Sequence, residues 1–233
     1  MLLVLEDEAA HAAEKPRAIA ELIEKRAAFV DEVRRRGVLR DTGQLRLSRE
    51  GKRVRRTGGR LEIDDGPFTE DGKALGAYYV IETNGLDEAA RLATECPALA
   101  VDEVDVRPVM KGRVVGGKND KRGKLFACAV LGNAATEDAW VTVMDRIDAD
   151  THNCFPPDSF LGGVRLEPPK SGRRVVTRGE RRATFDGPFL ESKEVIGGLF
   201  ILRMASMHDA VRWAGETPFM VHGTLEIREL WRT

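Results

Sequence analysis

Asp65-Gly66-Pro67-Phe68 and Asp186-Gly187-Pro188-Phe189 are the same four residues, repeated 121 positions apart in a chain of 233 residues. Around them, residues 58–109 align without a gap on residues 179–230. Identical residues occupy 14 of these 52 positions, where average usage predicts roughly three or four by chance. An ungapped repeat means that elements and turns correspond one to one. The sequence therefore predicts two copies of one unit, at residues 1–110 and 124–233, joined by a linker at 111–123.

Charge and cysteine content narrow the class of protein. Lys and Arg number 37 against 38 Asp and Glu, so the net charge is −1, which argues against a nucleic-acid or membrane-surface partner. The basic run at 49–60 has no interleaved aromatic residue to stack on bases. Three cysteines without metal-ligand spacing suit a reducing compartment. The start of the chain lacks the features of a signal peptide, and no apolar run reaches the length of a membrane span. We expect a cytoplasmic protein.

Hydrophobic periodicity and turn residues predict the same element order in both copies: strand, helix, strand, hairpin, strand, helix, strand. In the first copy the predicted ranges are 2–6, 16–36, 44–48, 52–56 with 60–63, 75–82, 86–95 and 102–109. In the second copy they are 125–131, 137–150, 166–170, 173–177 with 181–185, 195–203, 208–215 and 224–230. This is an α+β fold, a ferredoxin-like βαββαβ unit with an inserted hairpin. The glycine-rich, basic stretch 111–124 is predicted to be a flexible connector.

Each predicted sheet has helices on one face and an apolar second face that needs cover. Because the two copies are tethered, we expect their sheets to pack on each other within one chain, as an intramolecular dimeric α/β barrel. The cavity between the sheets would then bind a small molecule. Self-association of the whole chain stays open.

The repeated motif resembles the YCII-related family, in its DGPF-domain branch. The family pattern Asp-Gly-Pro-Phe-x-Glu-x-Lys-Glu-x-x-Gly-Gly is matched most fully from Asp186 to Gly198, whereas the first copy departs from it at Gly72-Lys73 and Ala77. The resemblance implies a dimeric α/β-barrel fold and, in related YCII proteins, a His–Asp pair as the proposed catalytic element. It also implies gene neighbourhoods with extracytoplasmic-function sigma factors, and no established reaction for most of the branch.

Asp65 and Asp186 are the candidate general bases, because each carboxylate ends a strand at a repeated turn. The alternative is a structural role in which each side chain binds its own turn. His11 follows the first strand, about where YCII proteins carry their histidine, and is the third candidate catalytic residue. It would form a dyad with Asp65 if the fold brings them together.

Glu70, Glu191, Arg107 and Arg228 are candidate substrate-binding residues, and each has a structural alternative in ion pairs. No metal site, phosphate loop or cofactor motif is recognisable, so no cofactor is expected. Two functions remain open. One is a cofactor-independent acid–base enzyme, of isomerase or lyase type, acting on a small organic molecule. The other is a non-catalytic small-molecule binding or regulatory module, linked to sigma-factor signalling.

Overall fold

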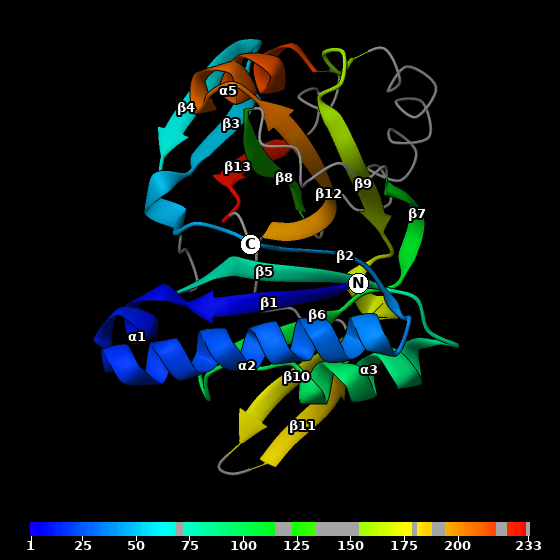
Figure 1. Cartoon of the computed structure of the whole chain (residues 1–233). Helices are drawn as coiled ribbons and strands as arrows, with labels where there is room; N and C mark the ends of the chain where they lie inside the picture. Colours follow the sequence, from blue (N-terminus) through cyan, green and yellow to red (C-terminus); the bar gives the residue numbers. More distant parts are fainter. Residues whose placement is uncertain are drawn as a thin grey trace. The chain divides into compact units, whose positions relative to one another are not determined.

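The computed structural model describes residues 1–68, 72–114, 123–133, 154–178, 181–187, 194–217 and 223–231. The chain divides into two compact units, each drawing on separate stretches of sequence. Unit 1 comprises residues 1–44, 68–108 and 167–191, and unit 2 comprises residues 45–67, 109–166 and 192–233. The fold is mixed α+β, with one antiparallel sheet in each unit (Figure 1).

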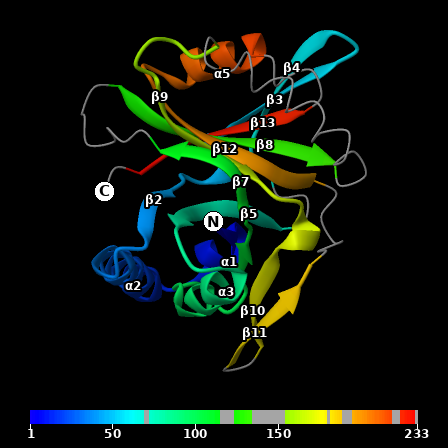
Figure 2. The same ribbon diagram turned by 90° about the vertical axis from the view of Figure 1, so that its right-hand side faces the viewer.

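Among the described residues, six strands form the sheet of unit 1, in the order β11-β10-β6-β1-β5-β2. Figure 2 shows α2 and α3 side by side on one face of this sheet. The elements are β1 (Leu2–Asp7), α1 (Glu8–Ala13), α2 (Pro16–Arg35), β2 (Leu39–Gln44), β5 (Lys73–Ile81), α3 (Leu86–Glu95), β6 (Glu103–Val106), β10 (Arg173–Arg178) and β11 (Arg181–Asp186).

The helices of unit 1 follow from their sequences. Pro16 occupies the first turn of α2, where its missing N–H costs nothing, and Gly37 ends the helix with φ +73°. Leu22, Phe29 and Val33 lie at helical spacing on its buried face. The ring of Phe29 meets Tyr79 of β5 edge-on, with 5.3 Å between centroids. Burial of this apolar stripe fixes α2 on the sheet.

In unit 2, the described part of the chain forms a sheet in the order β4-β3-β13-β8-β12-β9-β7. A cluster of buried side chains that includes Phe126, Phe200 and Trp213 forms its core beneath α5. The elements are β3 (Lys52–Thr57), β4 (Arg60–Asp65), β7 (Val109–Val114), β8 (Lys124–Asn133), β9 (Phe160–Leu166), β12 (Glu194–Met204), α5 (Met207–Glu216) and β13 (Thr224–Glu229). The helix predicted at 137–150 lies outside the described residues.

The two copies exchange their hairpins. The β3–β4 hairpin of the first copy pairs with β13, the last strand of the second copy, and the β10–β11 hairpin of the second copy pairs with β6, the last strand of the first. Lys52 lies opposite Ile227, and Arg173 opposite Val106, so both exchanges keep one register. Val54 and Val175 are buried at 0% and 2% exposure in the core that receives them. The sequence analysis was wrong to place each hairpin within its own copy.

Three predicted segments also differ from the structure. The strand predicted at 44–48 is β2, which lies earlier, and a 3-10 turn (Ser48–Glu50) follows it. The strand predicted at 166–170 is β9, which ends at Leu166 before a second 3-10 turn (Pro169–Ser171). The predicted connector begins as a strand, because Val109–Val114 pairs with β9 as the sheet edge β7. The glycine and the charged residues of this stretch are typical of a linker, so its sequence did not predict a strand. Backbone pairing at a sheet edge accepts such residues.

Candidate functional site

The two motif aspartates lie at the base of the exchanged hairpins. Asp65 forms an ion pair with Lys52, its partner across β3 and β4, and Asp186 forms one with Arg173, its partner across β10 and β11, at 2.9 Å. Their side chains are 75% and 84% exposed. The carboxylates are thus bound by cations of the same hairpin rather than by a histidine.

The glycine of each motif lies where no side chain fits. A Cβ on Gly66 would lie 1.9 Å from the carbonyl oxygen of Ser48, and a Cβ on Gly187 would lie 2.1 Å from that of Pro169. The 3-10 turn before each hairpin therefore packs directly on the motif backbone. The Asp and Gly of each motif, which the structure describes in both copies, therefore hold the base of the hairpin together.

Arg107 and Arg228 hold the chain that enters each exchanged hairpin. Arg107 is 3% exposed and donates from Nε and Nη2 to the carbonyl oxygen of Glu167. Arg228 is 1% exposed and donates in the same way to the carbonyl oxygen of Arg46. Since these acceptors are also 121 residues apart, the repeat preserves the contact, and both guanidinium groups bind backbone.

Glu70 and Glu191 lie outside the described residues, as do His152 and His222. His208 is exposed on α5. The histidine that the structure places in a polar cluster is His11.

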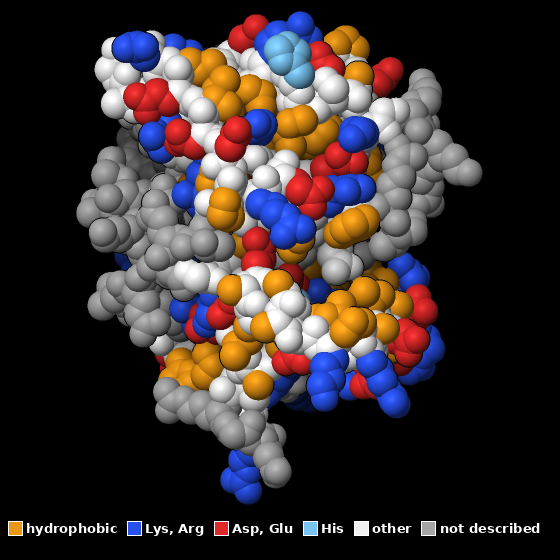
Figure 3. Space-filling model, turned by 90° about the vertical axis from the view of Figure 1, so that its left-hand side faces the viewer, with side chains coloured by type: hydrophobic (Ala, Val, Ile, Leu, Met, Phe, Trp, Pro, Cys, Tyr) orange, Lys and Arg blue, Asp and Glu red, His pale blue; other side chains and the backbone are white. Residues whose placement is uncertain are grey.

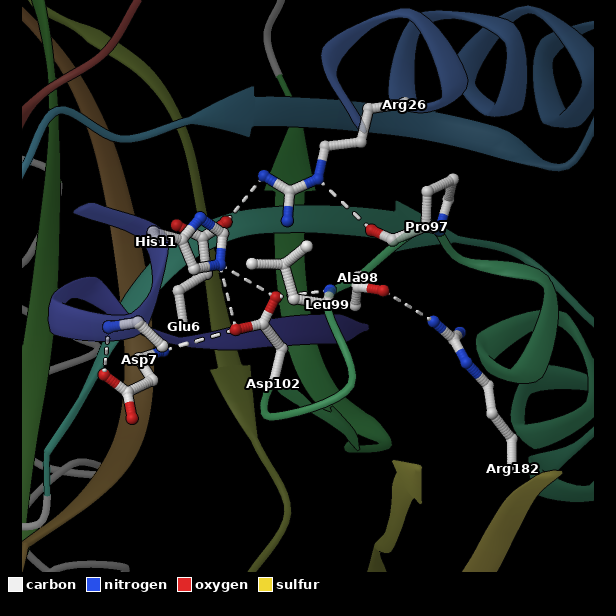
Figure 4. Close-up of polar contacts among 10 residues, drawn as sticks. Glu6, Asp7, His11, Arg26, Pro97, Ala98, Leu99, Asp102 and Arg182 are labelled. Carbon is white, nitrogen blue, oxygen red and sulfur yellow. Dashed lines mark hydrogen bonds and ion pairs between the residues drawn. The ribbon is translucent and has the colours of Figure 1, made fainter. Parts of the chain in front are cut away.

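His11 lies on α1, a short helix that follows β1. Asp7 caps this helix by accepting a hydrogen bond from the backbone N–H of Ala10, 2.9 Å away. The cap sets His11 one turn into the helix, where its Nε2 lies 2.9 Å from both carboxylate oxygens of Asp102 (Figure 4). The side chain of Asp102 is fully buried and that of His11 is 14% exposed. The partner of His11 is Asp102 rather than Asp65.

Asp102 is held in place by backbone as well as by the imidazole. Its Oδ2 accepts from the N–H of Leu99 at 2.7 Å, and its Oδ1 accepts from the N–H of Asp7 at 3.3 Å. The antiparallel pairing of β1 with β6 sets Leu5 opposite Glu103, which brings the start of the last strand to the end of the first. The sequence analysis missed Asp102. The signal was topological: in a βαββαβ unit these strand ends are neighbours.

A buried ion pair lies beside the dyad. Arg26 of α2 binds Glu6 of β1, with 2.6 Å between Nη1 and Oε1, and the two side chains are 7% and 12% exposed. Gly76 is skipped in the pairing of β1 with β5, as a β-bulge. A Cβ there would lie 1.9 Å from the carboxyl carbon of Glu6. The bulge glycine therefore leaves the space that the Glu6 carboxylate occupies.

The surroundings of His11 shift its proton affinity. The hydrogen bond to Asp102 raises the pKa of His11 above its ordinary value of 6.5, and the nearby Glu6 carboxylate adds to this. Burial and the charge of Arg26 act in the opposite direction. Among the described residues, Nδ1 has no hydrogen-bond partner, so Nε2 carries the proton to Asp102 and Nδ1 keeps the lone pair.

Other chemistry-bearing groups of unit 1 are inert or apart from the dyad. Burial raises the pKa of the Cys96 thiol to about 12, so it stays protonated at neutral pH. Within the described ranges, no three His, Cys, Asp or Glu side chains are arranged to hold a metal. A groove of 670 Å³ is lined by residues of α2, by residues 95–99 and by Arg182. His11 does not line it.

The surface offers no single-sign patch on the face drawn in Figure 3, where basic and acidic side chains are intermingled. None of the helices that the structure describes has the length and apolarity of a membrane span.

In the aligned sequence, the second copy has neither residue of the dyad. Leu3 pairs with Tyr78 and Ala129 pairs with Leu199, so β1 corresponds to β8 with an offset of 126. In the sequence, the same offset aligns Gly132 with Glu6 and Glu137 with His11; Glu137 lies outside the described residues. With the repeat offset of 121, Asp102 corresponds to Gly223. In the part of the chain that the structure describes, this cluster therefore occurs once.

Comparison with family models matches the YCII-related domain to residues 1–113 and again to residues 127–233. A search of curated proteins finds no match. The two family matches together span nearly the whole chain and both copies of the repeat. The chain belongs to the YCII-related domain family, of which it contains two tandem copies.

Proposed function

We propose that this chain is a cofactor-independent acid–base enzyme with one reactive site, the His11–Asp102 dyad, acting on a small organic molecule. The observation that carries the proposal is the geometry of the dyad: an imidazole, 14% exposed, whose Nε2 lies 2.9 Å from both oxygens of a fully buried carboxylate. Such a pair fixes the tautomer and stabilises the imidazolium that forms when the base takes a proton.

In this mechanism Nδ1 of His11 is the basic atom. It removes a proton from a C–H or O–H bond of the substrate, while Asp102 keeps its hydrogen bond to Nε2–H and stabilises the positive ring. The imidazolium then returns the proton to another atom of the substrate, for an isomerisation, or to a leaving group, for an elimination. The hydrogen bond to Asp102 raises the pKa of His11, so the ring that takes up the substrate proton is stabilised as the imidazolium.

Glu6 and Arg26 complete the site without joining the proton transfer. The Glu6 carboxylate favours the imidazolium, and Arg26 keeps that carboxylate paired. Asp65 and Asp186 are bound to Lys52 and Arg173, so we assign them a role at the hairpin base. The dimeric α/β barrel that the family resemblance implies and the ligand cavity expected between packed sheets remain predictions, as do self-association and cytoplasmic location.

Solvent hydrogen exchange tests the proposal without knowledge of the natural substrate. A panel of small enolisable acids and unsaturated lactones is incubated with the protein in D₂O, and deuterium incorporation is followed by proton NMR. We expect exchange in at least one compound, reduced about 100-fold or more in His11→Asn and Asp102→Asn. The matched controls Asp65→Asn and Asp186→Asn should retain it. Exchange that survives His11→Asn, or that disappears in Asp65→Asn, would contradict the assignment.

A further inference from the structure

The Cys96–Asp102 segment connects α3 to β6 and carries the main backbone support of Asp102. Within it, the N–H of Leu99 donates to Oδ2 of Asp102 at 2.7 Å, and the N–H of Asp102 donates to the carbonyl oxygen of Leu99 at 3.1 Å. The position of the carboxylate therefore depends on the path of this segment. Pro97 prevents α3 from continuing into it, so the segment has no regular structure to fix its path.

Two arginines hold the segment from different sides, as Figure 4 shows. Nε of Arg26 donates to the carbonyl oxygen of Pro97 at 3.2 Å. Arg182 donates to the carbonyl oxygens of Cys96 and, at 3.3 Å, of Ala98. Together with the Leu99–Asp102 bond, these contacts give four consecutive carbonyl groups a donor. Arg26 belongs to the first copy, whereas Arg182 lies on β11, in the hairpin that the second copy contributes.

Arg182 also binds the end of α3. Its Nη1 donates to the carbonyl oxygens of Ala93 and Thr94, at 3.3 and 3.1 Å. Both carbonyls belong to the last turn of α3, where the regular helical hydrogen bonds run out; that of Ala93 also accepts from the N–H of Cys96 at 3.3 Å. A positive charge is favourable at this end of a helix. One guanidinium thus joins the helix end to the segment that carries Asp102, because its planar group presents several donors at once.

The other exchanged hairpin shows that this arrangement is not a general need of the fold. The residue equivalent to Arg182 there is Leu61, whose side chain packs against Gly215 of α5. The end of α5 still receives an arginine, because Arg56 donates to the carbonyl oxygen of Gly215 at 2.9 Å. Gly223 stands where Asp102 would be. Arginine at this hairpin position therefore occurs where the neighbouring segment carries an aspartate, and leucine occurs where that segment carries a glycine.

We propose that Arg182 is a positioning residue of the His11–Asp102 site, supplied to it by the second copy through the exchanged hairpin. The proposal rests on the acid–base function assigned to that dyad. Arg182 lies behind the segment and acts through it: the guanidinium fixes the carbonyls of Cys96 and Ala98, these fix the N–H of Leu99, and that group fixes the carboxylate. The second copy would then complete the reactive site of the first rather than carry one of its own.

Replacement of Arg182 tests this, with the pKa of His11 measured by NMR as the main readout. The groups facing His11 are Asp102, Glu6 and Arg26, and Arg182→Ala leaves all three in the chain. We expect the measured pKa of His11 to fall by about 0.5 or more, with proton exchange about tenfold slower. Arg181→Ala, an exposed neighbour on β11, is the matched control and should change neither quantity.

Two further measurements separate positioning from plain stability. Guanidinium chloride at about 20 mM, far below denaturing concentrations, should partly restore the pKa of His11 in Arg182→Ala, whereas sodium chloride at equal concentration should not. Where Arg182→Ala does not fold, Arg182→Lys is measured in its place. One ammonium group cannot reach all four carbonyl oxygens that Arg182 binds, those of residues 93, 94, 96 and 98. A smaller fall in the pKa of His11 is therefore expected.

The readouts also distinguish this proposal from the function on which it rests. A folded Arg182 variant that is less stable but keeps the wild-type pKa of His11 would overturn the positioning role. If the pKa of His11 shifts in the Arg182 variant but the unmodified protein exchanges no substrate proton, the positioning role is supported and the acid–base function is contradicted.

Discussion

Within the folded chain, His11 binds its proton more tightly than it would in an unfolded peptide, since Nε2–H donates to a buried carboxylate. A group whose pKa is raised by folding stabilises the native state fully below its unfolded pKa of 6.5, and this contribution is lost as pH rises through the higher folded value. The dyad therefore stabilises the fold most at mildly acidic pH.

His11→Asn tests this dependence. We expect it to lower the free energy of unfolding by about 1–3 kcal/mol at pH 5.5, the typical contribution of a hydrogen bond to a charged group, and by less at pH 9. Urea denaturation at both pH values measures the difference. His208→Asn, at an exposed position, is the control and should show little loss at either pH. An equal loss at both pH values for His11→Asn would show that the dyad is uncharged.

The motif glycines give a second test at the residue scale. Gly66→Ala and Gly187→Ala should each destabilise the chain by about 2 kcal/mol or more, because the new methyl group meets a backbone carbonyl that cannot move aside alone. Gly37→Ala provides the comparison: no atom lies within 4 Å of its Cβ, and only the positive φ of +73° opposes it, at about 1 kcal/mol. If Gly66→Ala costs no more than Gly37→Ala, the packing at the hairpin base is looser than described.

At the scale of elements, local sequence patterns predicted whether a segment is a helix or a strand better than they predicted which strand it pairs with. The helix ranges 16–36 and 86–95 are confirmed by α2 and α3, and the β3–β4 hairpin turns where Gly58 and Gly59 adopt φ +56° and +83°. The exchange was not predictable, since the repeat makes β6 and β13 equally suitable partners and no local property distinguishes them. β2 was placed too late because residues 44–48 alternate between polar and apolar, whereas the strand ends at Gln44 and a 3-10 turn begins at Ser48.

A paired cysteine experiment tests the exchange. Arg55 lies opposite Thr224 across β3 and β13, a separation that suits a disulfide. Without the exchange, the equivalent partner of Arg55 would be Glu103. We expect the Arg55→Cys/Thr224→Cys variant to form an intramolecular disulfide on mild oxidation, found by peptide mass mapping at the mass of one chain. Arg55→Cys/Glu103→Cys should not. A disulfide in the second variant, or a dimer in the first, would refute exchange within one chain.

For the whole molecule, the residues that repeat in both copies make structural contacts, and the residues that do not repeat form the proposed site. Asp65 with Asp186, and Arg107 with Arg228, are duplicated and make the same structural contacts twice. His11, Asp102 and Arg182 are unmatched in the other copy. The sequence analysis favoured the aspartates because they repeat, and found His11 from the family resemblance. It missed Asp102 because 91 residues separate the pair, and only the antiparallel contact of β1 with β6 joins them.

The proposed function requires that the imidazole of His11 is an activated base. Long-range proton–nitrogen NMR of the ¹⁵N-labelled chain, titrated from pH 5 to 9, reports the tautomer and pKa of each of its four histidines, assigned by single His→Asn variants. The account predicts that His11 is protonated on Nε2 when neutral and titrates above 6.5. A neutral His11 with its proton on Nδ1, or a pKa at or below 6.5, would contradict it.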